Sequence, residues 1–153
     1  MRLVPAVLIV AAALLVPAVM GNAGAPAAPA AKAVTLTADE GAVAKNGKVV
    51  KDGSGMQVDF LAYKHGTGLD IKAGRQGTSH MPLHKHKKKD KYKAVKDVPC
   101  VKPLDSEKNA YLSLPEVGRG FTFVGNKSSG YYRGVVKSLA AGKITVEFEK
   151  CPE

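Results

Sequence analysis

Short apolar runs bounded by Gly, Asn and Asp recur from residue 33 to the C-terminus. This regular spacing of turn residues limits the chain to a fold built from strands. Runs such as AVTLT, KVV and LDIKA are separated by KNGK, KDGSG and HGTG. Gly, Asn and Asp tolerate the backbone conformations of tight turns, whereas β-branched residues favour extended chain. We therefore expect a mostly β domain, either a small barrel or a β-sandwich.

The C-terminal third carries the strongest strand pattern. We expect strands near residues 120–124, 131–139 and 143–149, linked by the turn-rich GNKSSG and by AAGK. In the last of these, Ile144, Val146 and Phe148 alternate with polar residues, as in a strand with one face on a core and one in water. In MQVDFLAY (56–63) both faces carry apolar side chains, so that strand is expected to be buried on both sides.

The stretch 117–149 resembles the strand sequence of SH3-like barrels. A glycine-led VGRGFTFV, a loop, GYYRGVVKSL, a glycine turn and KITVEF follow in that order, and YYRGVV is similar to a motif of Tudor domains. The acidic-aromatic-glycine ending of Tudor domains is missing, because Glu149, Lys150 and Cys151 stand there, so no cage for methylated side chains is carried over. The resemblance implies a binding module in an SH3-like barrel.

The first residues have the organisation of an export signal. Arg2 precedes an almost wholly apolar run from Leu3 to Met20, and small residues follow it. Signal peptidase requires small side chains at the cleavage site, so we expect a signal peptide over 1–23, cleaved after Ala23. The alternative is a retained membrane anchor, against which Pro5 and the small-residue exit argue. We expect a secreted or periplasmic product without a transmembrane anchor after cleavage.

Cysteine usage fits that compartment. Cys100 and Cys151 are the two cysteines of the chain, and two cysteines in an exported protein usually oxidise to each other. A metal or redox role is the alternative, but their spacing matches neither a CxxC redox motif nor a zinc knuckle. We predict a disulfide between them.

Positive charge is concentrated in one segment. The chain carries 23 Lys plus Arg against 13 Asp plus Glu, and Lys85 to Lys96 alone has a net charge of +6, with Asp90 as its one acidic residue. Such a run repels itself, so we expect an exposed loop or a mobile arm. It is either a solubilising loop or a site for anionic polymers or surfaces, and export argues against nucleic acid. The residues of this predicted polyanion site are Lys85, Lys87, Lys88, Lys89, Lys91, Lys93 and Lys96.

Three histidines stand at the head of the same segment. His84 and His86 point the same way on an extended chain, and His80 and His84 do so on a helical turn, so either geometry offers two imidazoles to copper or zinc. The lysines that follow penalise a cation. Metal binding by His80, His84 and His86 is therefore the competing hypothesis, and no other cofactor is expected.

Catalytic motifs are scarce. We find no GxSxG, HExxH or phosphate-binding glycine loop, and nothing in the spacing of Asp59, Asp70 and Glu116 requires them to act as acid and base. The sequon Asn126-Lys127-Ser128 is expected to be a turn. No catalytic residue is assigned, and an envelope enzyme is the third alternative.

The sequence thus predicts an exported, non-catalytic binding or structural module. Sparse aromatic residues, with no Trp, disfavour an aromatic sugar cleft and a stacking platform for single-stranded nucleic acid. The expected organisation is a signal peptide (1–23), an Ala/Pro-rich linker (24–32), a β-rich segment (33–75), a basic His/Lys-rich loop (76–98) and a disulfide-tied, SH3-like β-meander (99–153).

Overall fold

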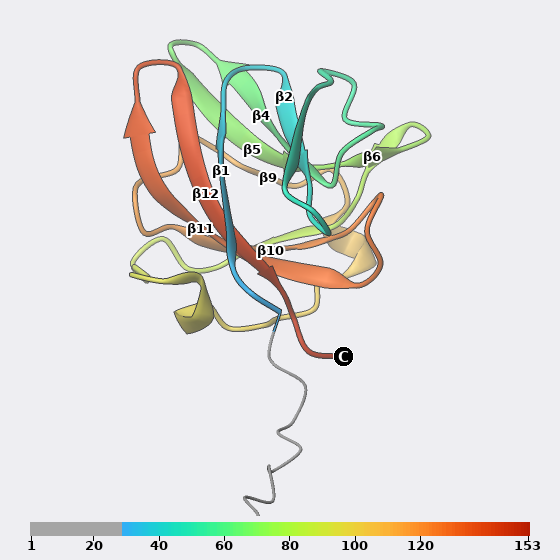
Figure 1. Cartoon of the computed structure of the whole chain (residues 1–153), viewed down its shortest axis with the longest axis vertical. Coiled ribbons are helices and arrows are strands. Elements are labelled where there is room, and N and C mark those ends of the chain that lie inside the picture. The colour runs from blue at the N-terminus through green and yellow to red at the C-terminus, as the bar shows by residue number, and fades with distance from the viewer. Residues whose placement is uncertain (1–28) are drawn as a thin grey trace, which may run out of the picture.

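The computed structural model describes residues 29–153, which form two five-stranded antiparallel sheets (Figure 1). The expected signal peptide 1–23 and the first residues of the expected linker lie outside the described part. Within residues 29–153 no helix is both long and apolar enough to span a membrane.

One sheet joins the C-terminal meander to two strands from earlier in the chain. Its order is β1-β12-β11-β10-β8, and Figure 1 shows β1, at the blue end of the colour scale, beside the red β12. The pairing of Leu36 with Ile144 fixes their register. The strands are Lys32–Leu36 (β1), Leu83–Lys85 (β8), Gly120–Val124 (β10), Tyr131–Ala140 (β11) and Lys143–Lys150 (β12).

The second sheet comes mainly from the first half of the chain. Its order is β3-β2-β4-β5-β9, and a separate two-stranded hairpin, β6-β7, comes directly after β5 in the sequence. The strands are Glu40–Val43 (β2), Lys48–Lys51 (β3), Phe60–His65 (β4), Gly68–Ala73 (β5), Arg75–Gln76 (β6), Ser79–His80 (β7) and Tyr111–Leu112 (β9). Two short 3-10 helices, Val95–Asp97 (η1) and Asp105–Glu107 (η2), lie in the long connection between β8 and β10.

The two sheets enclose one hydrophobic core. The ring of Phe60, on β4, lies 5.1 Å from the ring of Phe123 on β10 and 5.1 Å from that of Phe148 on β12. All three side chains are fully buried. Both β-rich halves therefore share a core. The pairing within residues 29–153 leaves two separate sheets, which is the arrangement of a β-sandwich and not of a closed barrel.

The expected C-terminal strands are confirmed as β10, β11 and β12, and the inward face of β12 is Ile144, Val146 and Phe148. Gly134, inside the Tudor-like YYRGVV, lies opposite Phe121, and a Cβ there would come within 2.6 Å of the Phe121 ring. The glycine of that motif thus makes room for a core aromatic ring.

The strand expected over 56–63 begins later than the sequence suggests. β4 starts at Phe60, and Met56 is exposed. The preceding residues belong to a turn in which Asp52 accepts hydrogen bonds from the backbone N–H groups of Ser54 and Gln57. This local side-chain bonding competes with strand pairing and delays the strand. From Val58 to Ala62 every side chain is buried, so the expected burial on both sides is confirmed.

The predicted disulfide is present. Cys100 and Cys151 are bonded, with their Cα atoms 5.7 Å apart. Cys151 directly follows β12, and Cys100 lies between η1 and η2. The bond therefore fastens the connection that follows the basic run to the end of the meander.

Candidate anion-binding site

The basic segment, defined as Lys85 to Lys96, runs from the end of β8 into η1. All seven of its lysines are exposed, as their self-repulsion predicts. Among the salt bridges of residues 29–153, one involves these seven lysines: Lys91 Nζ lies 2.5 Å from Glu116 Oε2. The other six ammonium groups are therefore open to an external anion.

The backbone of the basic segment is fastened to the sheet at both ends. Lys85 pairs with Phe121 across β8 and β10. The backbone N–H of Tyr92 donates to the carbonyl of Gly118 over 2.9 Å, and that of His86 donates to the carbonyl of Gly120 over 3.3 Å. The sequence suggested a loop or a mobile arm, but these bonds hold the segment against β10.

A second, smaller core lies beneath the C-terminal part of the segment. Val95 and Val98 pack on Val135 of β11, with Tyr92 alongside. Arg133 Nη1 donates to the carbonyls of Lys96 and Val98, over 2.9 Å each, while its other nitrogens bind Glu149. The meander thus supplies both an apolar base and a cationic clamp, which set the positions of the exposed lysines.

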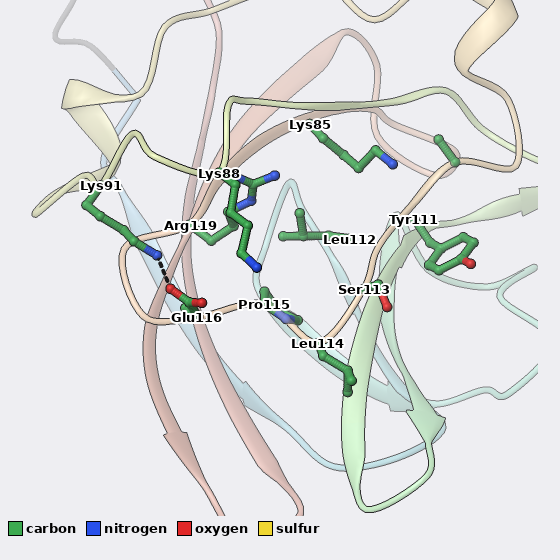
Figure 2. Close-up of a pocket in the computed structure, with 11 residues that line it drawn as sticks. Lys85, Lys88, Lys91, Tyr111, Leu112, Ser113, Leu114, Pro115, Glu116 and Arg119 are labelled. Carbon is green, nitrogen blue, oxygen red and sulfur yellow. Dashed lines mark hydrogen bonds and ion pairs between the residues drawn. The ribbon is translucent and has the colours of Figure 1, made fainter.

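A cavity of about 330 Å³ opens beside the N-terminal part of the segment. Figure 2 shows Lys85, Lys88 and Lys91 reaching from the segment toward the loop that carries Leu112 to Glu116. We call it the basic cavity, because four cationic side chains and one carboxylate line it. Its lining residues are Lys85, Lys88, Lys91, Ala110, Tyr111, Leu112, Ser113, Leu114, Pro115, Glu116 and Arg119.

The pKa of Glu116, the carboxylate of this cavity, is lowered by the surrounding positive charges. The hydrogen bond from Lys91 lowers the pKa of Glu116, and the charges of Lys91, Lys88 and Arg119 lower that pKa further. Glu116 therefore stays ionised and neutralises part of the positive charge. An anion in the cavity would meet the remaining cations.

Arg119 has an unusual environment. Its Nη1 is buried and finds no hydrogen-bond partner among residues 29–153. The backbone is fixed by a bond from the N–H of Arg119 to the carbonyl of Glu116 and by a bond from the N–H of Val136 to the carbonyl of Arg119. A buried guanidinium donor without a partner is costly, which makes it a position where an acceptor would stabilise the protein.

The three histidines are not gathered at one point. His80 Nδ1 lies 2.7 Å from the carbonyl of Ala73, whereas the rings of His84 and His86 meet edge to face with centroids 5.1 Å apart. His84 Nδ1 lies 2.6 Å from Glu107 Oε1. Within residues 29–153 no group of three or more His, Cys, Asp or Glu side chains is placed to hold a metal. Metal binding by the three histidines stays a prediction.

His86 is almost fully buried, and its Nε2 finds no partner in the described part of the chain. Burial, followed by the nearby charge of His84, lowers the pKa of His86. Its ring packs edge to face on Tyr92, with centroids 5.8 Å apart. His86 therefore serves as a neutral anchor of the basic segment at neutral pH.

Each of the carboxylates considered for acid–base chemistry already has hydrogen-bond partners within the protein. Asp70 accepts a bond from the N–H of Leu114 over 2.9 Å and lies 3.0 Å from His65 Nδ1. Ser113 Oγ lies 3.5 Å from that same Nδ1. In a catalytic triad the aspartate and the serine bind different nitrogens of the histidine ring. Here Asp70 and Ser113 both approach Nδ1 of His65, so this arrangement does not reproduce a catalytic triad.

Asp59 is the fully buried centre of the turn 125–130, which we call the Asp59 turn. Its Oδ1 accepts from the backbone N–H groups of Asn126, Lys127 and Ser128 over 2.6, 2.5 and 2.9 Å. Its Oδ2 accepts from the N–H of Ala44 over 2.7 Å and from Ser128 Oγ over 2.5 Å. The sequon is thus a turn, as expected, and the carboxylate that holds it is saturated with donors.

The comparisons with known proteins add no family. A scan against protein-family models and searches of curated proteins and of solved structures gave no match to this chain. The resemblance of 117–149 to SH3-like and Tudor domains therefore stays a prediction, and the function must be argued from the site itself.

Sequence reasoning found the lysines but missed Arg119 and Glu116 as their neighbours. Arg119 precedes β10, which pairs with β8 although residues 86–119 separate the two strands in the sequence. Nothing in the local sequence indicates that pairing, because strand order depends on the whole core. The one local sign in the sequence is the glycine before Arg119, and in the structure this Gly118 has a positive φ.

Proposed function

We propose that this protein is an exported, non-catalytic binding module that engages anionic polymers or surfaces through the basic segment. The main observation in favour is that seven exposed lysines stand on a backbone fixed to the sandwich. Within the described residues only one of them, Lys91, forms an ion pair. Like charges held close together repel, and an external polyanion relieves that repulsion. The disulfide supports export, because such bonds persist in oxidising compartments.

Anchoring distinguishes this segment from a solubilising loop. A loop needed only for solubility gains nothing from a buried histidine, a clamp by Arg133 and a separate valine core. Preorganisation reduces the entropy lost on binding, so a fixed array of lysines binds a polyanion better than a free chain of equal charge. We therefore assign the array a recognition role.

The test compares two variants of equal net charge. In one, the four segment lysines outside the basic cavity, Lys87, Lys89, Lys93 and Lys96, become alanine. In the other, four exposed lysines elsewhere, Lys45, Lys48, Lys51 and Lys64, become alanine. Binding to dextran sulfate, with neutral dextran as the control ligand, is followed by fluorescence anisotropy as the salt concentration rises.

We expect the native protein to bind dextran sulfate with an affinity that falls steeply with salt. The segment variant should lose about tenfold in affinity, since each exposed ionic contact is worth about 0.2–1 kcal/mol. The matched variant should stay within about twofold of the native protein. Equal losses in the two variants would reduce the effect to net charge and overturn the proposal, as would binding that does not respond to salt.

A further inference from the structure

The basic cavity differs from the rest of the lysine array, because its cations come from separate parts of the chain and converge on one hollow. We propose that it is a specific site for one phosphate or sulfate ester group, with Lys85, Lys88 and Arg119 as the binding residues. This inference rests on the proposed function in that such groups are the charged units of an anionic polymer.

The first argument is the unsatisfied donor. Arg119 is one of the lining residues, and its buried Nη1 has no hydrogen-bond partner among residues 29–153, although its backbone is fixed on both sides. Guanidinium groups bind phosphate and related oxyanions through several N–H donors at once. A tetrahedral oxyanion has enough acceptor oxygens to bind Arg119 and both lysines, whereas a planar carboxylate has two.

The second argument is the charge balance. Glu116 is the one carboxylate among the lining residues, and it already binds Lys91. Lys85 and Lys88 form no salt bridge within the described part of the chain. An entering anion would therefore meet two free ammonium groups and a guanidinium, while Glu116 opposes it by like charge.

The third argument is the shape and lining. At about 330 Å³ the cavity is at the lower end of the range of small-molecule sites, which is more than a bare oxyanion fills. The wall opposite the lysines includes Tyr111, Leu112, Leu114 and Pro115. The geometry therefore fits an ester whose charged end meets the cations and whose carbon skeleton contacts this apolar wall.

A second cavity of about 440 Å³ is the competing location. Four lysines, Lys32, Lys45, Lys127 and Lys150, contribute to it together with Glu149. Lys150 is already paired with Glu153, and no buried unpaired donor lies among its lining residues in the described chain. Lysines alone act as point charges without the fixed fork of an arginine. This cavity therefore provides the control site.

The experiment is an NMR titration of the full chain with inorganic phosphate, inorganic sulfate, phenyl phosphate and phenyl sulfate, each at constant ionic strength set with sodium chloride. We expect saturable shifts of backbone amides in residues 85–91 and 112–119. The esters should bind more tightly than the inorganic ions, and the stronger of the two esters identifies the group. Absence of saturable shifts in these residues would overturn the inference, as would esters that bind no tighter than the ions.

Four variants sharpen the assignment. Lys88→Ala should weaken phenyl phosphate binding about tenfold, the value of one charge-assisted hydrogen bond. Lys89→Ala removes the same charge from a neighbouring exposed position outside the cavity and should change the affinity less than about twofold. Glu116→Gln should strengthen binding, because it removes the opposing charge. Equal effects of Lys88→Ala and Lys89→Ala, or loss of shifts in Lys45→Ala, would contradict the site.

The two proposals fail in different ways. If dextran sulfate binds but the small esters do not, the cavity assignment is wrong and the lysine array remains. If the esters bind in the cavity and dextran sulfate does not bind, the array proposal is wrong and the cavity remains a small-anion site.

Discussion

The Asp59 turn and the basic segment both place charge in a loop, and they use it in opposite ways. In the turn a single carboxylate is buried and accepts five hydrogen bonds. In the segment seven ammonium groups stand in solvent with one ion pair in the described chain, and other residues fix their backbone. The comparison shows that the buried charge organises structure, whereas the exposed charges depend on structure organised elsewhere and remain free for a ligand.

The largest expected effect is on the Asp59 turn. Asp59→Ala leaves four backbone N–H groups and one hydroxyl without their acceptor in a buried site, and each unsatisfied donor costs about 1–3 kcal/mol. We expect the free energy of unfolding to fall by at least about 4 kcal/mol, measured by urea denaturation.

Asp52→Ala is the matched control for this variant. Asp52 also accepts bonds from the backbone N–H groups of a turn, but in an exposed position where water replaces lost partners. The control should lose no more than about 1 kcal/mol. If Asp59→Ala were as mild as the control, the turn would not depend on its buried charge.

The second largest effect concerns the disulfide, which fastens the chain just beyond the basic segment. Replacing both Cys100 and Cys151 by alanine releases a loop of 51 residues. The loop-entropy account predicts a loss of about 2–4 kcal/mol. Urea denaturation of the variant measures it, and the oxidised and reduced native protein should differ by a similar amount. A variant as stable as the native protein would show that sandwich packing alone holds this connection.

The sequence was informative where a structural property depends on neighbouring residues. Alternation of Ile144, Val146 and Phe148 identified the inward face of β12, and the turn at the sequon followed from its composition. The disulfide followed from the presence of two cysteines and from the expected export of the chain. These inferences need only local periodicity and composition.

The sequence was silent where distant segments meet. The pairing of β1 with β12 and of β8 with β10, the burial of His86 and the place of Arg119 all depend on how the two sheets close over Phe60 and Phe123. Asp59 illustrates the limit, because the sequence shows an acidic residue inside the apolar run 56–63 and gives no sign of its partners. Only the return of the 125–130 turn makes it a buried acceptor.

The next effect, of intermediate size, tests how the basic segment is anchored. Burial lowers the pKa of His86, so below its ordinary pKa of about 6.5 the unfolded chain binds this proton more readily than the folded one. The contribution of His86 to stability is therefore complete above that pH and is lost as the pH falls toward the lowered folded value.

We expect the thermal midpoint of the native protein to fall between pH 7.5 and 5 by about 3 °C more than that of His86→Gln, in which this proton is absent. The side chains that influence His86, namely His84, Asp90 and Arg119, are unchanged in the variant and cancel in the difference. Parallel falls in the two proteins would show that His86 does not couple the segment to pH.

The smallest expected effect on stability completes the comparison. Lys87, Lys89, Lys93 and Lys96 form no salt bridges in the described chain, and they repel one another. Their joint replacement by alanine should leave the urea midpoint unchanged or slightly higher at low salt, and the difference should vanish as salt screens the repulsion. A fall comparable to that of Asp59→Ala would mean that the lysines support the fold. An unchanged midpoint together with weaker binding to dextran sulfate would separate the two uses of charge, since the same substitution would then affect recognition and leave folding intact.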